Sequence, residues 1–368
     1  MREKYIGYCK KNPEEIKKIW DEGLITFDAN VLLNLYRYST NTKKEILKLI
    51  EKFSNKIFLT HQAGLEFHRN RFETISEQEK IYKEFTENLI KIEDELNSKS
   101  KHPFLSIKLQ QKLNSVFKEV KEETKHNENY YCNLIVNDEI YDEISKIFNG
   151  KTEDEFSEQE LIKLLEEGKK RFESKIPPGY EDEKDKTGNK IYGDFILWKQ
   201  IINKAKNSNK SIILVTDEKK KDWWWKLKNG KTIGPRQELV EEIYRETGVG
   251  FHLYSTEKFL EYGLSYLNEG NKPKVIEEVK SFTAEKSRLK ELLEIIEKNY
   301  SAKNESVYNE KLMEIENQMS KHKAEQKFLS NNGLEDDISK MRYMELDYLM
   351  HKLEFERLEL LDKMRAKQ

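Results

Sequence analysis

Four acidic residues stand where the sequence predicts the ends of strands or the first turns of helices: Asp28, Glu66, Asp194 and Asp217. Asp28 and Asp217 each follow a short apolar run that predicts a buried strand. Glu66 and Asp194 each fall early in a predicted helix beside such a strand. In an open α/β sheet, ligands bind where the carboxyl ends of the strands meet. We therefore expect these four carboxylates to lie close together.

Carboxylates gathered in one cleft repel one another, so such a group is tolerated mainly where a cation holds it together. A site made of carboxylates favours the hard ions Mg²⁺ and Mn²⁺, which keep several waters and contact phosphate oxygens. One or two such ions can activate water and stabilise the leaving oxygen of a phosphodiester. Glu218 and Asp222 lie near enough to Asp217 in the chain to add a ligand or position water. Taken alone, Asp28 has a simpler interpretation, as the cap of the following helix.

These positions require a mainly parallel sheet with helices on both faces. Apolar runs predict strands near residues 24–27, 56–60, 211–216 and 251–254, and helical patterns separate them. This alternation is typical of a parallel sheet, and we predict a three-layer α/β/α sandwich. Residues 73–172 carry apolar residues every three or four positions among many Lys and Glu, which predicts an inserted set of amphipathic helices.

The predicted domain organisation has three parts. Residues 1–72 and 173–268 form the α/β domain, residues 73–172 the helical insertion, and residues 269–368 a C-terminal helical region. In the last region Leu, Ile and Met recur among Lys and Glu, which predicts long helices with a narrow apolar seam. This region is interpreted either as a coiled-coil hairpin or as an oligomerisation arm, and it could bind a second copy or a regulatory protein.

Composition limits the remaining possibilities. Charged residues make up 36% of the 368 residues, yet the net charge is −2, so any nucleic-acid site must be a local patch. The chain has two cysteines, Cys9 and Cys132, too far apart for a C-x-x-C motif, which argues against a thiolate zinc site. Neither a signal-peptide core nor an apolar run of roughly 18 residues occurs. We expect a soluble cytoplasmic protein that does not enter a membrane.

A local patch of lysines and tryptophans follows Asp217. Its candidate nucleic-acid contacts are Lys219, Lys220, Lys221, Trp224 and Lys226. Lysines can neutralise phosphates while tryptophan faces stack on bases, a combination suited to single strands. The alternative is that the lysines form a solvated face and that Trp223 or Trp224 belongs to the core.

Other catalytic classes lack support in the sequence. His61 and His68 flank Glu66 without the H-E-x-x-H spacing or a cysteine partner, so a zinc site is not predicted. An aspartyl phosphatase also begins with a strand running into Asp, but that chemistry usually needs a second acid two residues on, where this chain has Asn30. Serine hydrolase, P-loop and dinucleotide motifs do not occur.

Several segments resemble the PIN domain nucleases: Asp28-Ala29-Asn30-Val31-Leu32, Glu66, Tyr192-Gly193-Asp194 and Val215-Thr216-Asp217. The segments 176–180, 193–200 and 216–224 are similar to a bacterial PIN-like group with a long helical insertion. The resemblance covers about residues 20–265, apart from much of the insertion.

This resemblance implies a metal-dependent endonuclease that acts on RNA, with DNA as the alternative, and leaves a 5′-phosphate and a 3′-hydroxyl. The implied metal ligands are Asp28, Glu66, Asp194 and Asp217, with Asn30 and Thr216 as supporting polar residues. Glu218 stands where a second aspartate is more usual. Because an uncontrolled ribonuclease is toxic to its host, a toxin or anti-phage role is expected by analogy. The competing hypothesis is an inactive PIN-like scaffold that acts through its C-terminal helices.

Overall fold

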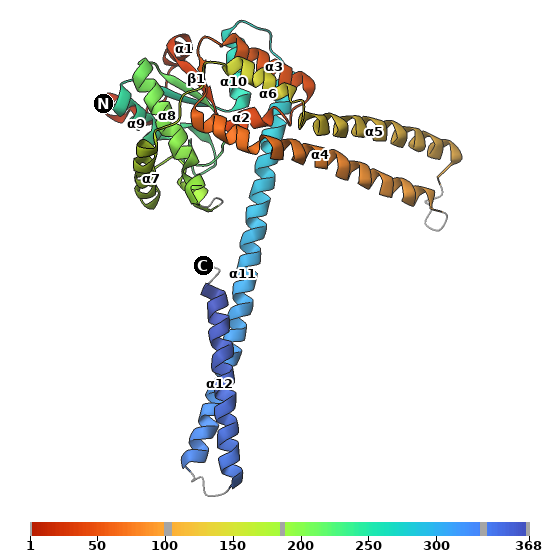
Figure 1. Ribbon diagram of the computed structural model, residues 1–368, viewed down its shortest axis with the longest axis vertical. Helices are drawn as coiled ribbons and strands as arrows, with labels where there is room; N and C mark the ends of the chain where they lie inside the picture. The colour runs from red at the N-terminus through yellow and green to blue at the C-terminus, as the bar shows by residue number, and fades with distance from the viewer. Residues whose placement is uncertain (1, 99–104, 185–187, 332–336, 366–368) are drawn as a thin grey trace. The chain divides into compact units, whose positions relative to one another are not determined.

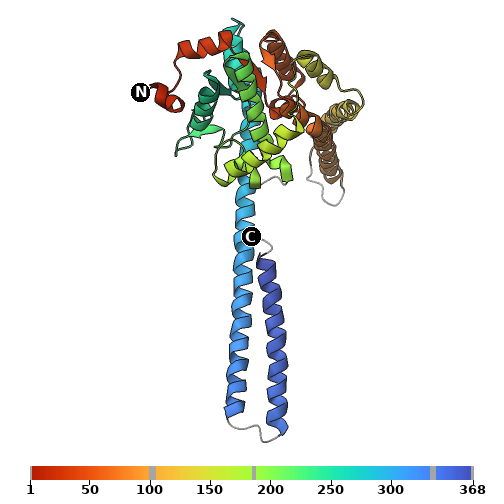
Figure 2. The ribbon, with the colours of Figure 1, turned by 60° about the vertical axis from the view of Figure 1, so that its left-hand side comes forward.

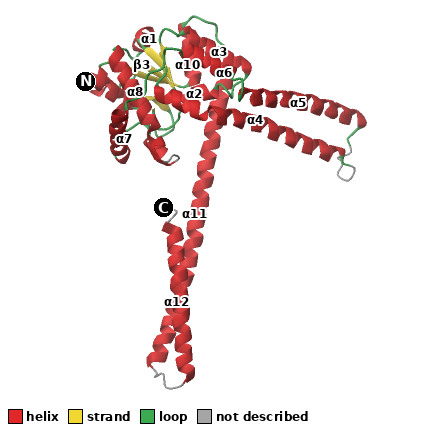
Figure 3. Cartoon of the chain, in the orientation of Figure 1, coloured by secondary structure: helices red, strands yellow, loops and turns green. Residues whose placement is uncertain are grey.

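A computed structural model describes residues 2–98, 105–184, 188–331 and 337–365, in two compact units, Met1–Thr283 and Ala284–Gln368. The described part of the first unit contains a four-stranded parallel sheet in the order β2-β1-β3-β6. Its strands are β1 (Leu24–Phe27), β2 (Ile57–Phe58), β3 (Ile212–Val215) and β6 (Phe251–Tyr254). Figure 3 shows these short strands enclosed by helices.

Helices cover both faces of this sheet (Figure 1). One face carries α1 (Pro13–Glu22), α3 (Thr40–Lys52) and α10 (Thr256–Tyr266), and the other carries α8 (Gly193–Ser208) and α9 (Gln237–Thr247). Successive side chains of a strand point to opposite faces of the sheet, so Phe251 and Tyr254 of β6 contact different helical layers. Phe251 lies 4.9 Å from the ring of Trp198 on α8, and Tyr254 lies 5.8 Å from the ring of Trp20 on α1. The predicted α/β/α sandwich is confirmed.

The strands are short and mostly apolar, with Thr26 in β1 and His252 in β6 as the polar exceptions, as expected for a parallel sheet covered by helices. Every residue of β1 and of β3 is buried. Phe27 pairs in register with Val215, which in turn pairs with Tyr254, so the carboxyl ends of β1, β3 and β6 are level. Residues that follow these three strands therefore meet at one edge.

Between β2 and α8 the chain forms α4 (His61–Asn97), α5 (Ile107–Leu134), α6 (Glu139–Phe148) and α7 (Glu158–Glu173). Helices α4 and α5 run side by side (Figure 1), joined by a 3.0 Å hydrogen bond between Thr86 and Thr124 and by stacked rings of Tyr82 and Tyr131. The first turns of α4 are buried against the sheet-bearing body. Helix α4 is therefore one continuous element that begins in the body and continues into the α4–α5 arm.

Helix α9 was not predicted from the sequence, and neither was the antiparallel hairpin of β4 (Trp224–Lys226) and β5 (Thr232–Pro235). The hairpin turn contains Asn229-Gly230, and Gly230 has a φ of 82°, a conformation that favours glycine. An Asn-Gly pair between two short runs is a hairpin signal, and the surrounding lysines obscure it.

The C-terminal helices predicted from the apolar seam are present as α11 (Pro273–Asn331) and α12 (Asp337–Arg365). Within the second unit the two helices lie side by side (Figure 2). Arg342 of α12 donates a 2.9 Å hydrogen bond to Glu325 of α11, and Leu346 and Leu353, seven residues apart, are buried. A seven-residue spacing of buried leucines is that of a coiled-coil seam. None of the helices in the described residues is both long enough and apolar enough to cross a membrane.

Candidate active site

Asp28 lies at the carboxyl edge of the sheet, directly after β1. Its Oδ2 accepts hydrogen bonds from the Thr216 hydroxyl, which follows β3, and from the Asn30 amide, both at 2.6 Å. Asp28 occupies the N-cap position of α2 (Ala29–Asn34), but its side chain makes no capping hydrogen bond. Its carboxylate is therefore held both by the end of β3, through Thr216, and by the first turn of α2, through the Asn30 side chain.

Glu66 and Asp194 are brought to one place by a close approach of α4 and α8. Glu66 lies in the second turn of α4, where its Oε1 accepts a 2.6 Å hydrogen bond from Gln62. A Cβ on Gly193 would lie only 2.5 Å from that oxygen, so a larger residue here would push the Glu66 carboxylate aside. Asp194 follows Gly193, and its Oδ2 accepts a 3.0 Å hydrogen bond from the indole of Trp223.

The pKa of Asp28 indicates which acids lie near it. Removal from water, followed by the negative charge of Glu66, raises the pKa of Asp28 from 3.8 to about 7. Glu218 adds to this increase, while the hydrogen bond from Thr216 opposes it. Because like charges act strongly only over short distances in a partly buried site, Glu66 and Glu218 both belong to the surroundings of Asp28. We call Asp28, Glu66, Asp194 and Glu218 the acidic cluster.

Asp217 is held differently from the acidic cluster. Its Oδ2 accepts hydrogen bonds from the Asn34 amide and the Thr256 hydroxyl, both at 2.9 Å, and its Oδ1 accepts one from the Thr256 backbone N–H at 3.0 Å. Asp217 thereby joins the end of α2 to the start of α10. In contrast, Glu66 Oε2 has no hydrogen-bond partner among the described residues, and the side-chain hydrogen bonds to Asp28 both go to its Oδ2.

Lys220, predicted as a nucleic-acid contact, lies against the acids. Its ammonium pairs with the buried carboxylate of Asp182 and lies 3.4 Å from Glu218 Oε2. Burial disfavours its charge, but Glu218, Asp194 and Asp182 outweigh that effect and raise the pKa of Lys220. A resident positive charge therefore offsets part of the negative charge on one side of the acidic cluster.

Asp222, predicted as a supporting acid, anchors the loop that begins with Pro177-Pro178. Its Oδ2 accepts backbone hydrogen bonds from Gly179 at 2.8 Å and Glu181 at 3.4 Å. Gly179 has a φ of 96°, and a Cβ there would lie 3.0 Å from the Cβ of Asp194. The loop therefore packs directly behind Asp194, and Asp222 holds it there.

A buried ion pair supports this loop from below. The guanidinium of Arg171 makes two hydrogen bonds to the carboxylate of Glu242, at 2.5 and 2.7 Å, and also donates to the Pro177 carbonyl. The indole of Trp198 donates a 2.9 Å hydrogen bond to the same carboxylate. These contacts explain why the segments around residues 171–179, 193–200 and 237–247 pack together near the site.

Three of the remaining residues of the lysine–tryptophan patch, Lys219, Lys226 and Trp224, donate hydrogen bonds to backbone carbonyls. Lys219 donates to the Thr283 carbonyl and Lys226 to the Lys219 carbonyl, both at 2.5 Å. The Lys221 side chain is 67% exposed, with its ammonium 3.7 Å from Glu181. Trp223 is buried, as the alternative interpretation expected, whereas Trp224 is half-buried and its indole donates to the Glu218 carbonyl at 2.5 Å.

Within the described residues, no group of three His, Cys, Asp or Glu side chains forms a ready-made metal site. The donor chemistry nevertheless fits a hard divalent cation. Glu66 offers an oxygen that no described residue binds, and burial, followed by repulsion from Glu66, raises the pKa of Asp28. A cation close to both carboxylates would relieve that repulsion.

Sequence reasoning did not find three polar residues that position the acids: Gln62, Asn34 and Thr256. Gln62 lies four residues before Glu66, and Asn34 lies four residues after Asn30, so helical spacing places each pair on one face. That spacing is a signal that could have identified Gln62 and Asn34. Thr256 is near Asp217 only because β6 lies beside β3, which no local pattern reveals.

A family model described as a PIN like domain matches residues 24–239, more than half of the chain. The matched range begins with β1, ends in α9, and contains all four acids that the sequence singled out. No curated protein and no solved structure matches the chain.

Proposed function

Because the chain belongs to the PIN-like domain family, we propose that it is a metal-dependent endonuclease that hydrolyses phosphodiester bonds in RNA. The observation that carries this proposal is the position of Asp28 at the carboxyl edge of the sheet, where Thr216 from the end of β3 holds its carboxylate. Burial first, and then the negative charge of Glu66, raise the pKa of Asp28 to about 7. Buried acids that lie close together are costly to ionise, and such groups are typical of a site that binds cations. DNA is the alternative substrate, and the same assay tests it.

In this proposal Asp28, Glu66, Asp194 and Asp217 hold Mg²⁺ or Mn²⁺. The ion, when bound, would lower the pKa of a water molecule and neutralise charge on the phosphate. Asn30 and Thr216 hold Asp28 through its Oδ2, and Trp223 holds Asp194 through its Oδ2. Asp217 Oδ1 accepts a single hydrogen bond and so keeps a lone pair for the ion or its water.

Lys220 and Glu218 have separate proposed roles. Lys220 offsets the charge of Glu218 and Asp194, which limits the repulsion in the protein without metal. Glu218 lies next to Asp28 and would orient a water molecule at the ion. Asp222 supports catalysis indirectly, because it holds the loop behind Asp194.

The test is cleavage of end-labelled single-stranded RNA and DNA in Mn²⁺, Mg²⁺ or EDTA. Wild type is compared with Asp28→Asn and Glu66→Gln, and Glu84→Gln serves as the matched control because Glu84 lies on the same helix with its side chain 58% exposed. We expect both site variants to lose about 100-fold or more in rate, a loss typical of removing one catalytic electrostatic group, while Glu84→Gln cuts normally.

Two outcomes would overturn the proposal. Cutting that persists in EDTA, or in both folded site variants, would show that the acids do not act through a metal. Absence of cutting together with no metal-dependent rise in melting temperature would favour the scaffold hypothesis, because binding to the native state must stabilise it.

We also propose that this activity serves as a toxin or anti-phage effector. Induced expression of wild type is expected to slow growth of the host or of infecting phage, whereas Asp28→Asn is not. Equal growth with both proteins would reject this role without affecting the nuclease proposal.

A further inference from the structure

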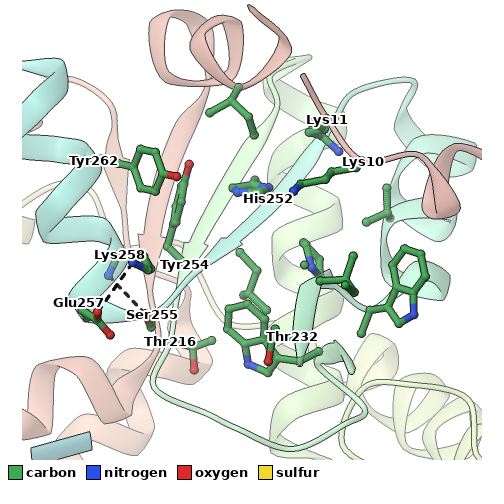
Figure 4. A pocket seen from close by; sticks show the side chains of 18 of the residues that line it. Lys10, Lys11, Thr216, Thr232, His252, Tyr254, Ser255, Glu257, Lys258 and Tyr262 are labelled. Carbon is green, nitrogen blue, oxygen red and sulfur yellow. Dashed lines mark hydrogen bonds and ion pairs between the residues drawn. The ribbon is translucent and has the colours of Figure 1, made fainter. Parts of the chain in front are cut away.

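A deep cleft runs along β6, the outer strand of the sheet, and we call it the edge cleft. Its cavity volume is about 1000 Å³, at the upper end of the roughly 300–1,000 Å³ common for ligand sites. Its walls come from the N-terminal segment and α1, from the β4–β5 hairpin, and from α10. Figure 4 shows His252 and Tyr254 of β6 in the cleft, with Lys10 and Lys11 beside His252.

One end of the edge cleft coincides with the candidate active site. Thr216, Asp217 and Glu218 line it there, directly after β3. A ligand that fills the cleft would therefore reach Asp217, one of the carboxylates that we propose to hold the metal. The cleft and the acidic cluster share Glu218.

The cleft wall carries an excess of positive charge. Of the described residues that line it, the charged ones are Lys10, Lys11, Lys17, Lys219, Lys226 and Lys258, with Asp217, Glu218 and Glu257. Asp217 and Glu218 lie at the end shared with the active site. Lys17 has no ion pair or hydrogen bond among the described residues, and Lys226 bonds to a backbone carbonyl. Positive charge along the wall and acids at one end suit a phosphate-bearing strand that leads to a metal site.

Aromatic rings stand on two walls of the cleft. Tyr262 of α10 is 49% exposed and packs against Tyr254 with ring centroids 5.2 Å apart. Trp225 of β4 is half-buried and packs edge-on against Tyr8 at 6.0 Å. Each ring keeps part of its surface open, and such faces bind unpaired bases by stacking.

His252 offers a polar group that no described residue uses. Burial, with a smaller effect from Lys11, lowers the pKa of His252 to about 3, so its imidazole is neutral near pH 7. A neutral imidazole has one N–H donor and one acceptor, and neither has a partner among the described residues. The edges of unpaired bases present both donors and acceptors, so they complement this group.

We propose that the edge cleft binds a base and its adjoining phosphates from the single strand cut at the acidic cluster, with His252 contacting the base edge. His252 pairs in register with Ile213, four residues before Asp217, so it lies about 13 Å back along the strand direction. The base at His252 therefore belongs to a neighbouring nucleotide, not to the bond that is cut. A peptide added to the open edge of β6 would not need the lysines, which favours a nucleic acid. This inference rests on the proposed nuclease function.

The test measures binding of fluorescein-labelled single-stranded RNA homopolymers to the full chain in EDTA, where no cutting is expected, by fluorescence anisotropy. His252→Phe keeps a ring but removes both hydrogen-bonding atoms, and Trp225→Ala removes a stacking face. Lys118→Gln is the control, because its side chain is 77% exposed on the α4–α5 arm. We expect Trp225→Ala to weaken binding at least about fivefold, and His252→Phe to reduce the differences between homopolymers.

A second measurement does not depend on variants that fold. Wild type is irradiated with 5-iodouracil-labelled RNA in EDTA, and crosslinked peptides are mapped by mass spectrometry. We expect crosslinks to Trp225, Tyr262 or the β6 peptide. Crosslinks confined to other parts of the chain would overturn the inference.

The outcomes separate this inference from the proposed function. If wild type cuts RNA but both cleft variants match it in affinity, base preference and KM, the edge cleft is not the binding site and the nuclease proposal stands. If RNA binds through Trp225 and His252 but no metal supports cutting, the cleft inference stands and the nuclease proposal fails. If RNA neither binds nor is cut, both fail.

Discussion

Replacing Asp28 with Asn should stabilise the metal-free protein, by an amount that depends on pH. The surroundings raise the pKa of Asp28 from 3.8 to about 7, so ionising this group in the folded protein costs up to about 4 kcal/mol more than in the unfolded chain. An asparagine cannot ionise and does not carry this cost. The substitution that we expect to abolish cleavage should therefore raise the free energy of unfolding.

The direction in which stability changes with pH follows from proton binding by Asp28. Between pH 3.8 and about 7 the folded protein keeps the Asp28 proton while the unfolded chain has lost it. Stability of wild type therefore falls as pH rises through this window, by about 1.4 kcal/mol per pH unit from this group, and levels off above pH 7. The advantage of Asp28→Asn over wild type should grow by about 2–3 kcal/mol between pH 5 and pH 8.

The assay is thermal unfolding of both proteins in EDTA at pH 5, 6, 7 and 8. The difference in melting temperature should widen by roughly 5–10 °C across this range, given the size of the domain. Asp94→Asn is the control, because Asp94 is exposed on α4 and has no ion pair among the described residues. Mn²⁺ should stabilise wild type at pH 8 and leave Asp28→Asn unchanged. A difference that stays constant from pH 5 to pH 8 would refute the assignment of Asp28 to a repelling cluster.

Three further substitutions test other parts of the structure. Arg171→Met leaves the Glu242 carboxylate buried without its partner and should lower the free energy of unfolding in urea by about 3–5 kcal/mol. The double variant Arg171→Met with Glu242→Leu should recover most of this stability. No recovery would mean that the loss of the ion pair does not cause the destabilisation. Gly193→Ala should abolish cleavage but leave the circular dichroism spectrum unchanged, because a Cβ would lie 2.5 Å from the Glu66 carboxylate and displace it. Normal cutting by this variant would show that the close contact between Gly193 and Glu66 is not required. Leu346→Lys should lower helical content by disrupting the α11–α12 pair but leave the rate of cutting unchanged; a loss of cutting would tie the second unit to catalysis.

Much of the sheet could be predicted because its signals are local. Apolar runs such as Ile212–Val215 mark buried parallel strands, and each acid that follows such a run must lie at the carboxyl edge. Glu66 and Asp194 could be placed because both fall near the starts of helices that flank the sheet. For these residues, position in the chain largely determines position in space.

The details of the site depend on contacts between distant segments. Asp217 looks equivalent to Asp28 in the sequence, yet its hydrogen bonds to Thr256 arise only because β6 lies beside β3. Lys220 looks like part of a solvated basic patch, and only the packing of the 177–184 loop brings Asp182 beside it. The edge cleft joins the N-terminal segment to α10, and no local pattern indicates that pairing.

Helix α4 has a mechanical consequence. It spans 37 residues, about 55 Å at the usual rise, and its buried residues end at Ile75. Glu66 lies about 13 Å on one side of Ile75, and the tip of the helix lies about 33 Å on the other side. If the helix pivots as a rigid rod at Ile75, a sideways displacement of the arm tip moves Glu66 by roughly two-fifths as much, in the opposite direction. In such a pivot the arm would act as a lever on Glu66, one of the proposed metal ligands, and a load at its far end would change the spacing between Glu66 and Asp28.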